Sequence, residues 1–113
     1  MDGFYSAFFT GLAGNSVGMF VFKSGVILGT DIGGMHYDGS YQVDEAAGNI
    51  TGRIVYVIPA GTSLITGVSN TNQPLRVEFP LELPLHFADG RVVTIQTPSG
   101  TINARFQKLR DWI

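Results

Sequence analysis

Apolar and polar residues alternate along this chain in short runs that are separated by turns. Glycine-containing turn signals divide segments rich in Phe, Tyr, Val, Ile and Thr about every eight to twelve residues, which is typical of strands joined by hairpins. The predicted strands cover residues 3–10, 17–23, 26–31, 35–43, 49–58, 75–83, 91–97 and 101–108.

The links between these segments indicate antiparallel pairing. Gly25, Gly90 and Gly100 each follow a Ser or Asp, at positions where a tight hairpin requires a positive φ. Only the last few residues contain an uninterrupted helical period, so the crossover helices that parallel strands need are not expected. The sequence therefore predicts one all-β domain over residues 1–113, an eight-stranded antiparallel up-and-down barrel.

Alternation with a period of two separates the inner face of the barrel from its outer face. It is clearest in the predicted strands at 49–58, 75–83 and 101–108, where every second residue is apolar. The residues expected to face inward on these strands are Ile50, Gly52, Ile54, Tyr56, Ile58, Leu75, Val77, Phe79, Leu81, Leu83, Ile102, Ala104 and Phe106.

The first two strands are apolar on both faces. Because a barrel wall has one inner side, the outward apolar residues of these strands are expected to lie at an interface. The candidates for a dimer surface are Phe4, Phe8, Met19 and Val21.

The interior of the barrel has two interpretations. An eight-stranded barrel has room either for its own packed side chains or for one small ligand. The inward tyrosines favour a cavity with polar groups, whereas inward glycines at 18, 39 and 52 fit both a cavity and the sharp bends of a small barrel. The candidate cavity residues are Tyr5, Phe9, Phe20, Phe22, Tyr37, Tyr41, Ile54, Tyr56, Val77 and Phe79.

Three further segments bear on how the barrel closes. Pro80 and Pro84 cannot donate ladder hydrogen bonds, so their strand is expected at an opening or a bulge. The long connection 59–74 is either a lid over the barrel mouth or a packed surface loop with no ligand beneath it. The tail 107–113 either extends the last strand or forms a helical turn that docks Trp112 over one barrel end.

Composition adds expectations about association and location. Charged residues make up 14% of the chain and its mean hydropathy is +0.19, so a self-associating surface is expected. With seven Lys and Arg and a net charge of −2, nucleic acid is not an expected partner. There is no cysteine, no signal-peptide pattern at the start and no apolar run long enough to span a bilayer. A cytoplasmic protein without a membrane partner is expected.

Four short motifs in the first half of the chain carry a family resemblance: Asp2-Gly3-Phe4-Tyr5-Ser6, Phe22-Lys23-Ser24-Gly25, Gly29-Thr30-Asp31 and Tyr37-Asp38-Gly39. In this order and spacing, they resemble the GrlR-type negative regulators of bacterial type III secretion, and the resemblance is strongest over residues 1–60. It implies a lipocalin-like barrel that forms homodimers and binds a transcriptional activator. It also implies a partner-binding acidic loop at positions 43–46, where this chain has Asp44 and Glu45.

Catalytic patterns are weak. Residues 14–18 match G-x-S-x-G, but a strand rather than a helix is expected after Ser16, so a loop role is preferred to a nucleophile. His36 and Asp38 share a strand face without an evident third metal ligand, and Glu78 and Glu82 resemble a solvated face. No enzyme activity, cofactor or metal is predicted.

Two functional hypotheses follow. The first is a non-enzymatic regulatory module that acts through protein contacts as a homodimer, with a regulatory protein as partner. The alternative is a carrier or sensor of a small apolar ligand that occupies the barrel cavity.

Overall fold

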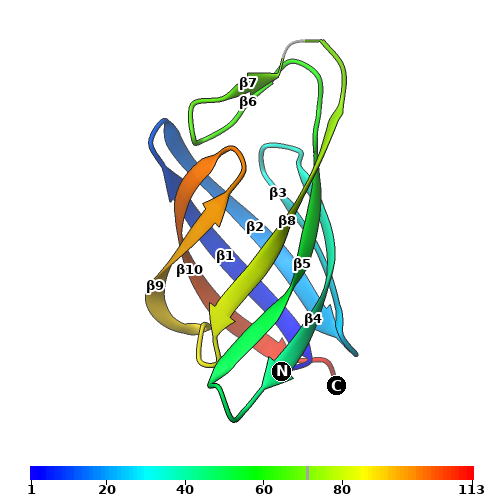
Figure 1. Ribbon diagram of the computed structural model, residues 1–113, viewed down its shortest axis with the longest axis vertical. Helices are drawn as coiled ribbons and strands as arrows, with labels where there is room; N and C mark the ends of the chain where they lie inside the picture. The colour runs from blue at the N-terminus through cyan, green and yellow to red at the C-terminus, as the bar shows by residue number, and fades with distance from the viewer. Residues whose placement is uncertain (71) are drawn as a thin grey trace.

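The structure is a computed structural model that describes residues 1–70 and 72–113, and within these residues it contains strands and turns but no helix (Figure 1). The strands of the main sheet are β1 (Gly3–Gly11), β2 (Gly14–Lys23), β3 (Val26–Asp31), β4 (His36–Asp44), β5 (Asn49–Ile58), β8 (Leu75–Pro84), β9 (Asp89–Thr97) and β10 (Gly100–Asp111). Two short strands, β6 (Thr62–Ser63) and β7 (Ser69–Asn70), form a separate hairpin.

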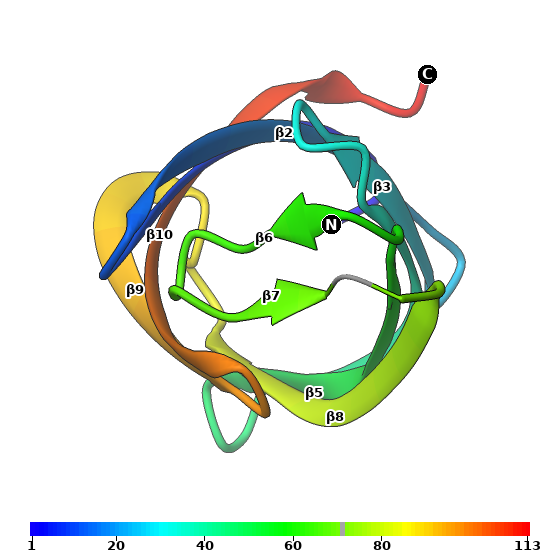
Figure 2. The ribbon, with the colours of Figure 1, turned by 90° about the horizontal axis from the view of Figure 1, so that it is seen from above.

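The eight-stranded sheet rolls into a barrel. Its order is β8-β5-β4-β3-β2-β1-β10-β9, and every adjacent pair is antiparallel. The ring is visible from above in Figure 2, where β8 and β9 approach each other as the two edges of the sheet. The predicted all-β, eight-stranded antiparallel barrel is confirmed, with closure incomplete along one seam.

This seam involves the proline-containing strand, as the sequence predicts. Pro80 and Pro84 lie on β8, which pairs with β5 on one side and is a sheet edge on the other. An edge strand tolerates proline because a missing N–H on its free side breaks no ladder hydrogen bond.

Strand ends differ from the sequence expectations at identifiable places. β2 begins at Gly14 rather than at residue 17, because the β1–β2 ladder continues to a tight turn in which Gly11 pairs with Gly14. β10 continues to Asp111, so the tail is a strand extension. Trp112 then stacks on Phe4 with ring centroids 5.4 Å apart, on the outer side of β1 rather than over a barrel end.

Alternation identifies the inner face correctly along most of the sheet. Most of the residues predicted to face inward on β5, β8 and β10 are buried, namely Ile50, Ile54, Tyr56, Ile58, Phe79, Leu81, Leu83, Ala104 and Phe106. Leu75, at the first position of β8, is an exception at 50% exposure. Of the inward glycines, Gly39 and Gly52 lie where β4 and β5 approach closely, and a Cβ at either would collide with a carbonyl oxygen of the neighbouring strand. These two positions therefore reflect barrel curvature.

One end of the barrel is filled by packed aromatic rings. Phe87, from the turn between β8 and β9, is buried with its ring centroid 5.5 Å from those of Tyr5 and Phe22 and 5.3 Å from that of Phe106. We call Tyr5, Phe22, Phe87 and Phe106 the aromatic plug. It closes the end of the barrel at which the N-terminus lies (Figure 1).

Candidate functional site

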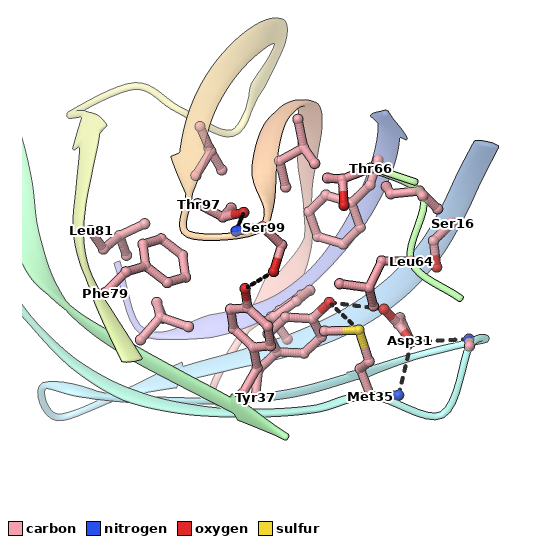
Figure 3. Close-up of a pocket in the computed structure, with 18 of the residues that line it drawn as sticks. Ser16, Asp31, Met35, Tyr37, Leu64, Thr66, Phe79, Leu81, Thr97 and Ser99 are labelled. Atoms are coloured by element: carbon pink, nitrogen blue, oxygen red, sulfur yellow. Dashed lines mark hydrogen bonds between the residues drawn. The ribbon is translucent and has the colours of Figure 1, made fainter. Parts of the chain in front are cut away.

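The other end of the barrel contains a cavity of about 350 Å³. Its apolar walls come from all sides of the barrel, and its polar groups are hydroxyls, one amide and one carboxylate (Figure 3). The apolar lining residues are Phe9, Phe20, Phe22, Ile27, Ile32, Met35, Ile54, Leu64, Ile65, Phe79, Leu81, Leu83, Ile95, Ile102 and Phe106. The polar ones are Asn15, Ser16, Asp31, Tyr37, Tyr56, Thr62, Ser63, Thr66, Thr97 and Ser99. The volume is within the usual range for small-molecule sites.

The β6–β7 hairpin lies across the mouth of this cavity (Figures 1 and 2). Leu64 is buried in the core, and its N–H donates to the Val68 carbonyl at 2.7 Å, which fixes the turn of the hairpin. The Ile65 carbonyl accepts a hydrogen bond from the Ala13 N–H at 2.5 Å, which fastens the hairpin to the β1–β2 turn. The described residues of this hairpin therefore lie over the barrel mouth, in the position that the lid interpretation predicts.

Most of the predicted cavity residues line the cavity, namely Phe9, Phe20, Phe22, Tyr37, Ile54, Tyr56 and Phe79. Tyr5 and Tyr41 are inward and buried but lie at the plugged end. Their hydroxyls donate to the Met1 carbonyl at 2.6 Å and to Asp2 Oδ1 at 3.0 Å. Val77 packs against the core without reaching the cavity. Alternation assigns a residue to the inner face but does not give its height along the barrel.

Asp31 and Tyr37 form a satisfied polar pair on the cavity wall. Asp31 Oδ1 accepts from the backbone N–H groups of Gly33 and Met35 at 3.0 and 3.1 Å, and Oδ2 accepts from the Tyr37 hydroxyl at 2.8 Å. Burial, together with the negative charge and hydrogen bond of Asp31, raises the pKa of Tyr37 far above its ordinary value. Tyr37 therefore remains a neutral hydrogen-bond donor at physiological pH.

A second polar pair lies on the side of the cavity formed by the β9–β10 turn. The hydroxyls of Tyr56 and Ser99 share a hydrogen bond of 3.1 Å, and the Ser99 N–H donates to Thr97 Oγ1 at 3.2 Å (Figure 3). These contacts hold the turn against the wall and leave few free hydrogen-bonding groups there.

Two cavity hydroxyls differ because they have no partner within the described residues. Ser16 Oγ on β2 and Thr66 Oγ1 on the hairpin are both buried from solvent, and neither makes a hydrogen bond. Ser16 itself is 7% exposed. Both lie at the lid side of the cavity in Figure 3. A buried polar atom without a partner is costly, so this pair marks the place where a ligand group would be stabilised.

The remaining sequence candidates lie outside this site or lack partners for chemistry. Because Ser16 Oγ makes no hydrogen bond, no base is positioned to activate it in the part of the chain that is described. His36 and Asp38 are exposed on β4, and no group of three metal-ligating side chains occurs among residues 1–70 and 72–113. Glu78 pairs with Arg53 at 3.0 Å on the outer surface, and Glu82 is exposed.

The predicted interaction residues are on the surface. Asp44 and Glu45 are exposed at the β4–β5 turn, where Asp44 Oδ1 also accepts from the Ala47 N–H at 3.0 Å. Phe8 and Met19 are 55% and 52% exposed on the outer face. Phe4 and Val21 are half-buried, Phe4 beneath Trp112.

Comparisons with family models, with curated proteins and with solved structures found no match to this chain. The resemblance to GrlR-type regulators therefore stays a prediction. Among the described residues, no helix has the length and apolar character required to cross a membrane.

Proposed function

We propose that this protein binds a small, mainly apolar molecule inside its barrel, as a carrier or sensor. The observation that supports the proposal is the cavity of about 350 Å³ that lies between the aromatic plug and the lid. The same barrel is filled by packed aromatic side chains at its plugged end. The barrel diameter alone therefore does not explain the cavity at the other end. Mainly apolar pockets of this size with a few polar groups are the usual form of small-molecule binding sites.

A fluorescent apolar probe tests this proposal. N-phenyl-1-naphthylamine is uncharged and becomes brighter in an apolar environment, so titration of the protein with this dye is expected to show saturable binding at one site. Ile95 lines the cavity from β9, so the indole ring of Ile95→Trp would occupy part of the cavity volume. This variant is expected to weaken dye binding at least tenfold.

Val92→Trp is the matched control, since Val92 is 55% exposed and does not line the cavity, although it lies on the same strand. Equal dye binding by the two variants would place the dye elsewhere and contradict the proposal.

A second candidate function, contact with another protein copy, rests on the outer face of β1, β2 and β3. Apolar side chains point outward from these adjacent strands and form what we call the outer apolar patch. Its members are Phe8, Val17, Met19, Val21 and Leu28. Phe8 pairs with Val17, and Val21 pairs with Leu28, so the patch is continuous across the strands. Contiguous exposed apolar surface on a small domain favours self-association, which is also what the resemblance to GrlR-type regulators implies.

Size-exclusion chromatography with light scattering tests the second candidate. We expect a dimer at micromolar concentration, and we expect Met19→Glu to convert it to a monomer because a charge would be buried at the interface. Val92→Glu introduces the same charge on another part of the outer face and is the control. A wild-type protein that is already monomeric would contradict this candidate and leave the cavity proposal unaffected.

A further inference from the structure

The cavity also indicates which class of ligand it accepts. We infer that the ligand is an uncharged amphiphile, an apolar body that ends in a hydroxyl or carbonyl group, with this end held between Ser16 and Thr66. The inference rests on the proposed function and deepens it by naming the chemistry of the ligand.

The position of the polar end follows from the two unpartnered hydroxyls. Ser16 Oγ comes from the barrel wall and Thr66 Oγ1 from the lid, and both are buried without a hydrogen bond within the described residues. A hydroxyl both donates and accepts, so a ligand alcohol or carbonyl at the lid side of the cavity can bond to these side chains. Several other polar groups on the wall already have partners. Asp31 bonds to Tyr37, and Tyr56 bonds to Ser99. Thr97 Oγ1 donates to the Gly100 carbonyl, and the Ser63 hydroxyl bonds to that of Ser69.

The absence of charge on the ligand follows from the lining residues. None of the described residues that line the cavity is Lys, Arg or His. An anionic head group would therefore be buried without a cation and in the same cavity as the Asp31 carboxylate, which is strongly unfavourable. A cationic head group has little to gain, because Asp31 already accepts three hydrogen bonds, from Gly33, Met35 and Tyr37.

The size of the ligand follows from the volume. A cavity of about 350 Å³ is at the lower end of the range for small-molecule sites, so the ligand is a compact molecule comparable in size with 1-decanol or N-phenyl-1-naphthylamine rather than a long-chain lipid. The apolar side chains reach from Leu64 on the lid to Phe22 and Phe106 in the plug, so the body of the ligand extends along the barrel axis away from Ser16.

Displacement of N-phenyl-1-naphthylamine by two probes of equal chain length tests the inference. We expect 1-decanol to displace the dye at a concentration at least tenfold lower than decanoate does at neutral pH. We further expect Ser16→Ala and Thr66→Val each to weaken 1-decanol binding about three- to tenfold, because each removes one hydrogen bond and little volume. The affinity of each variant for the dye is measured separately, so that dye displacement can be converted into the affinity for 1-decanol.

Thr94→Val is the matched control, since Thr94 lies on the outer face of β9 and bonds there to Asn103. If the dye binds but decanoate competes as well as 1-decanol, or if both cavity variants bind 1-decanol normally, the inference is wrong and the proposed function stands. If neither the dye nor 1-decanol binds, the proposed function itself is wrong.

Discussion

At the scale of single residues, the four tyrosines divide between two tasks. Tyr5 and Tyr41 close the plugged end through bonds to Met1 and Asp2, whereas Tyr37 and Tyr56 shape the cavity wall. All four point inward, which alternation predicts, but their heights in the barrel depend on register and on the path of the N-terminus. A sequence pattern with a period of two contains neither.

The raised pKa of Tyr37 leads us to expect a lower free energy of unfolding at high pH. Its pKa is raised in the folded protein by burial and by Asp31, so the folded state keeps the phenol proton that the unfolded state releases above its ordinary pKa of 10.0. The stabilisation is complete below about pH 10 and is lost above it at about 1.4 kcal/mol per pH unit. Urea unfolding between about pH 8 and about pH 11 measures this slope.

Tyr37→Phe is the comparison, and it is expected to have a shallower slope than the wild type. Burial also raises the pKa of Tyr5 and Tyr41, so part of the slope remains in the variant. Identical slopes in the two proteins would show that Tyr37 is not protected in the folded state.

Ser16 predicts an unusual response to truncation in the protein without ligand. Because Ser16 Oγ is buried without a hydrogen bond, Ser16→Ala is expected to leave the free energy of unfolding unchanged or to raise it by about 1 kcal/mol. Tyr56→Phe removes a bonded hydroxyl and is expected to lower it by about 1 kcal/mol. A loss of more than about 1 kcal/mol for Ser16→Ala would show that the hydroxyl already has a partner.

At the scale of elements, the long strands were predictable, whereas the sequence left the lid as one of two interpretations of segment 59–74 and did not indicate its hairpin. Each long strand is a run rich in strand-forming residues that is bounded by turn signals, so its position follows from sequence. The hairpin strands Thr62–Ser63 and Ser69–Asn70 are too short to alternate. Their place depends on Leu64 entering the core and on the Ile65 contact with Ala13, which join segments far apart in the chain. Phe87 was missed for the same reason, since it enters the core from a turn.

A disulfide between the lid and the β1–β2 turn tests whether the lid is the entrance. A Cβ at Gly67 would lie 3.8 Å from Ala13 Cβ, which is the usual separation in a disulfide, and the chain has no native cysteine. Oxidised Ala13→Cys/Gly67→Cys is expected to take up the dye at least tenfold more slowly than its reduced form in stopped-flow measurements.

Each single cysteine variant serves as control, because Gly67 has a φ of 98° and cysteine there is strained without any crosslink. Equal rates for the oxidised and reduced double variant would show that the ligand does not enter through the lid.

At the scale of the whole molecule, one wall separates the two candidate sites. Strand β2 presents Ser16, Phe20 and Phe22 to the cavity and Val17 and Met19 to the outer apolar patch. The barrel form and the two-sided character of this strand were predictable from composition along the chain. The empty volume was not, because it depends on how far the plug extends and on where the lid stops.

The most direct test of ligand binding in the barrel is methyl NMR of the protein titrated with N-phenyl-1-naphthylamine. Ile54, Leu64, Leu81 and Ile95 line the cavity, so their methyl resonances are expected to shift together in a saturable way. Methyls of Val17, Met19 and Leu28 on the outer apolar patch are expected to keep their positions. Shifts confined to the outer apolar patch, with the cavity methyls unchanged, would contradict the account.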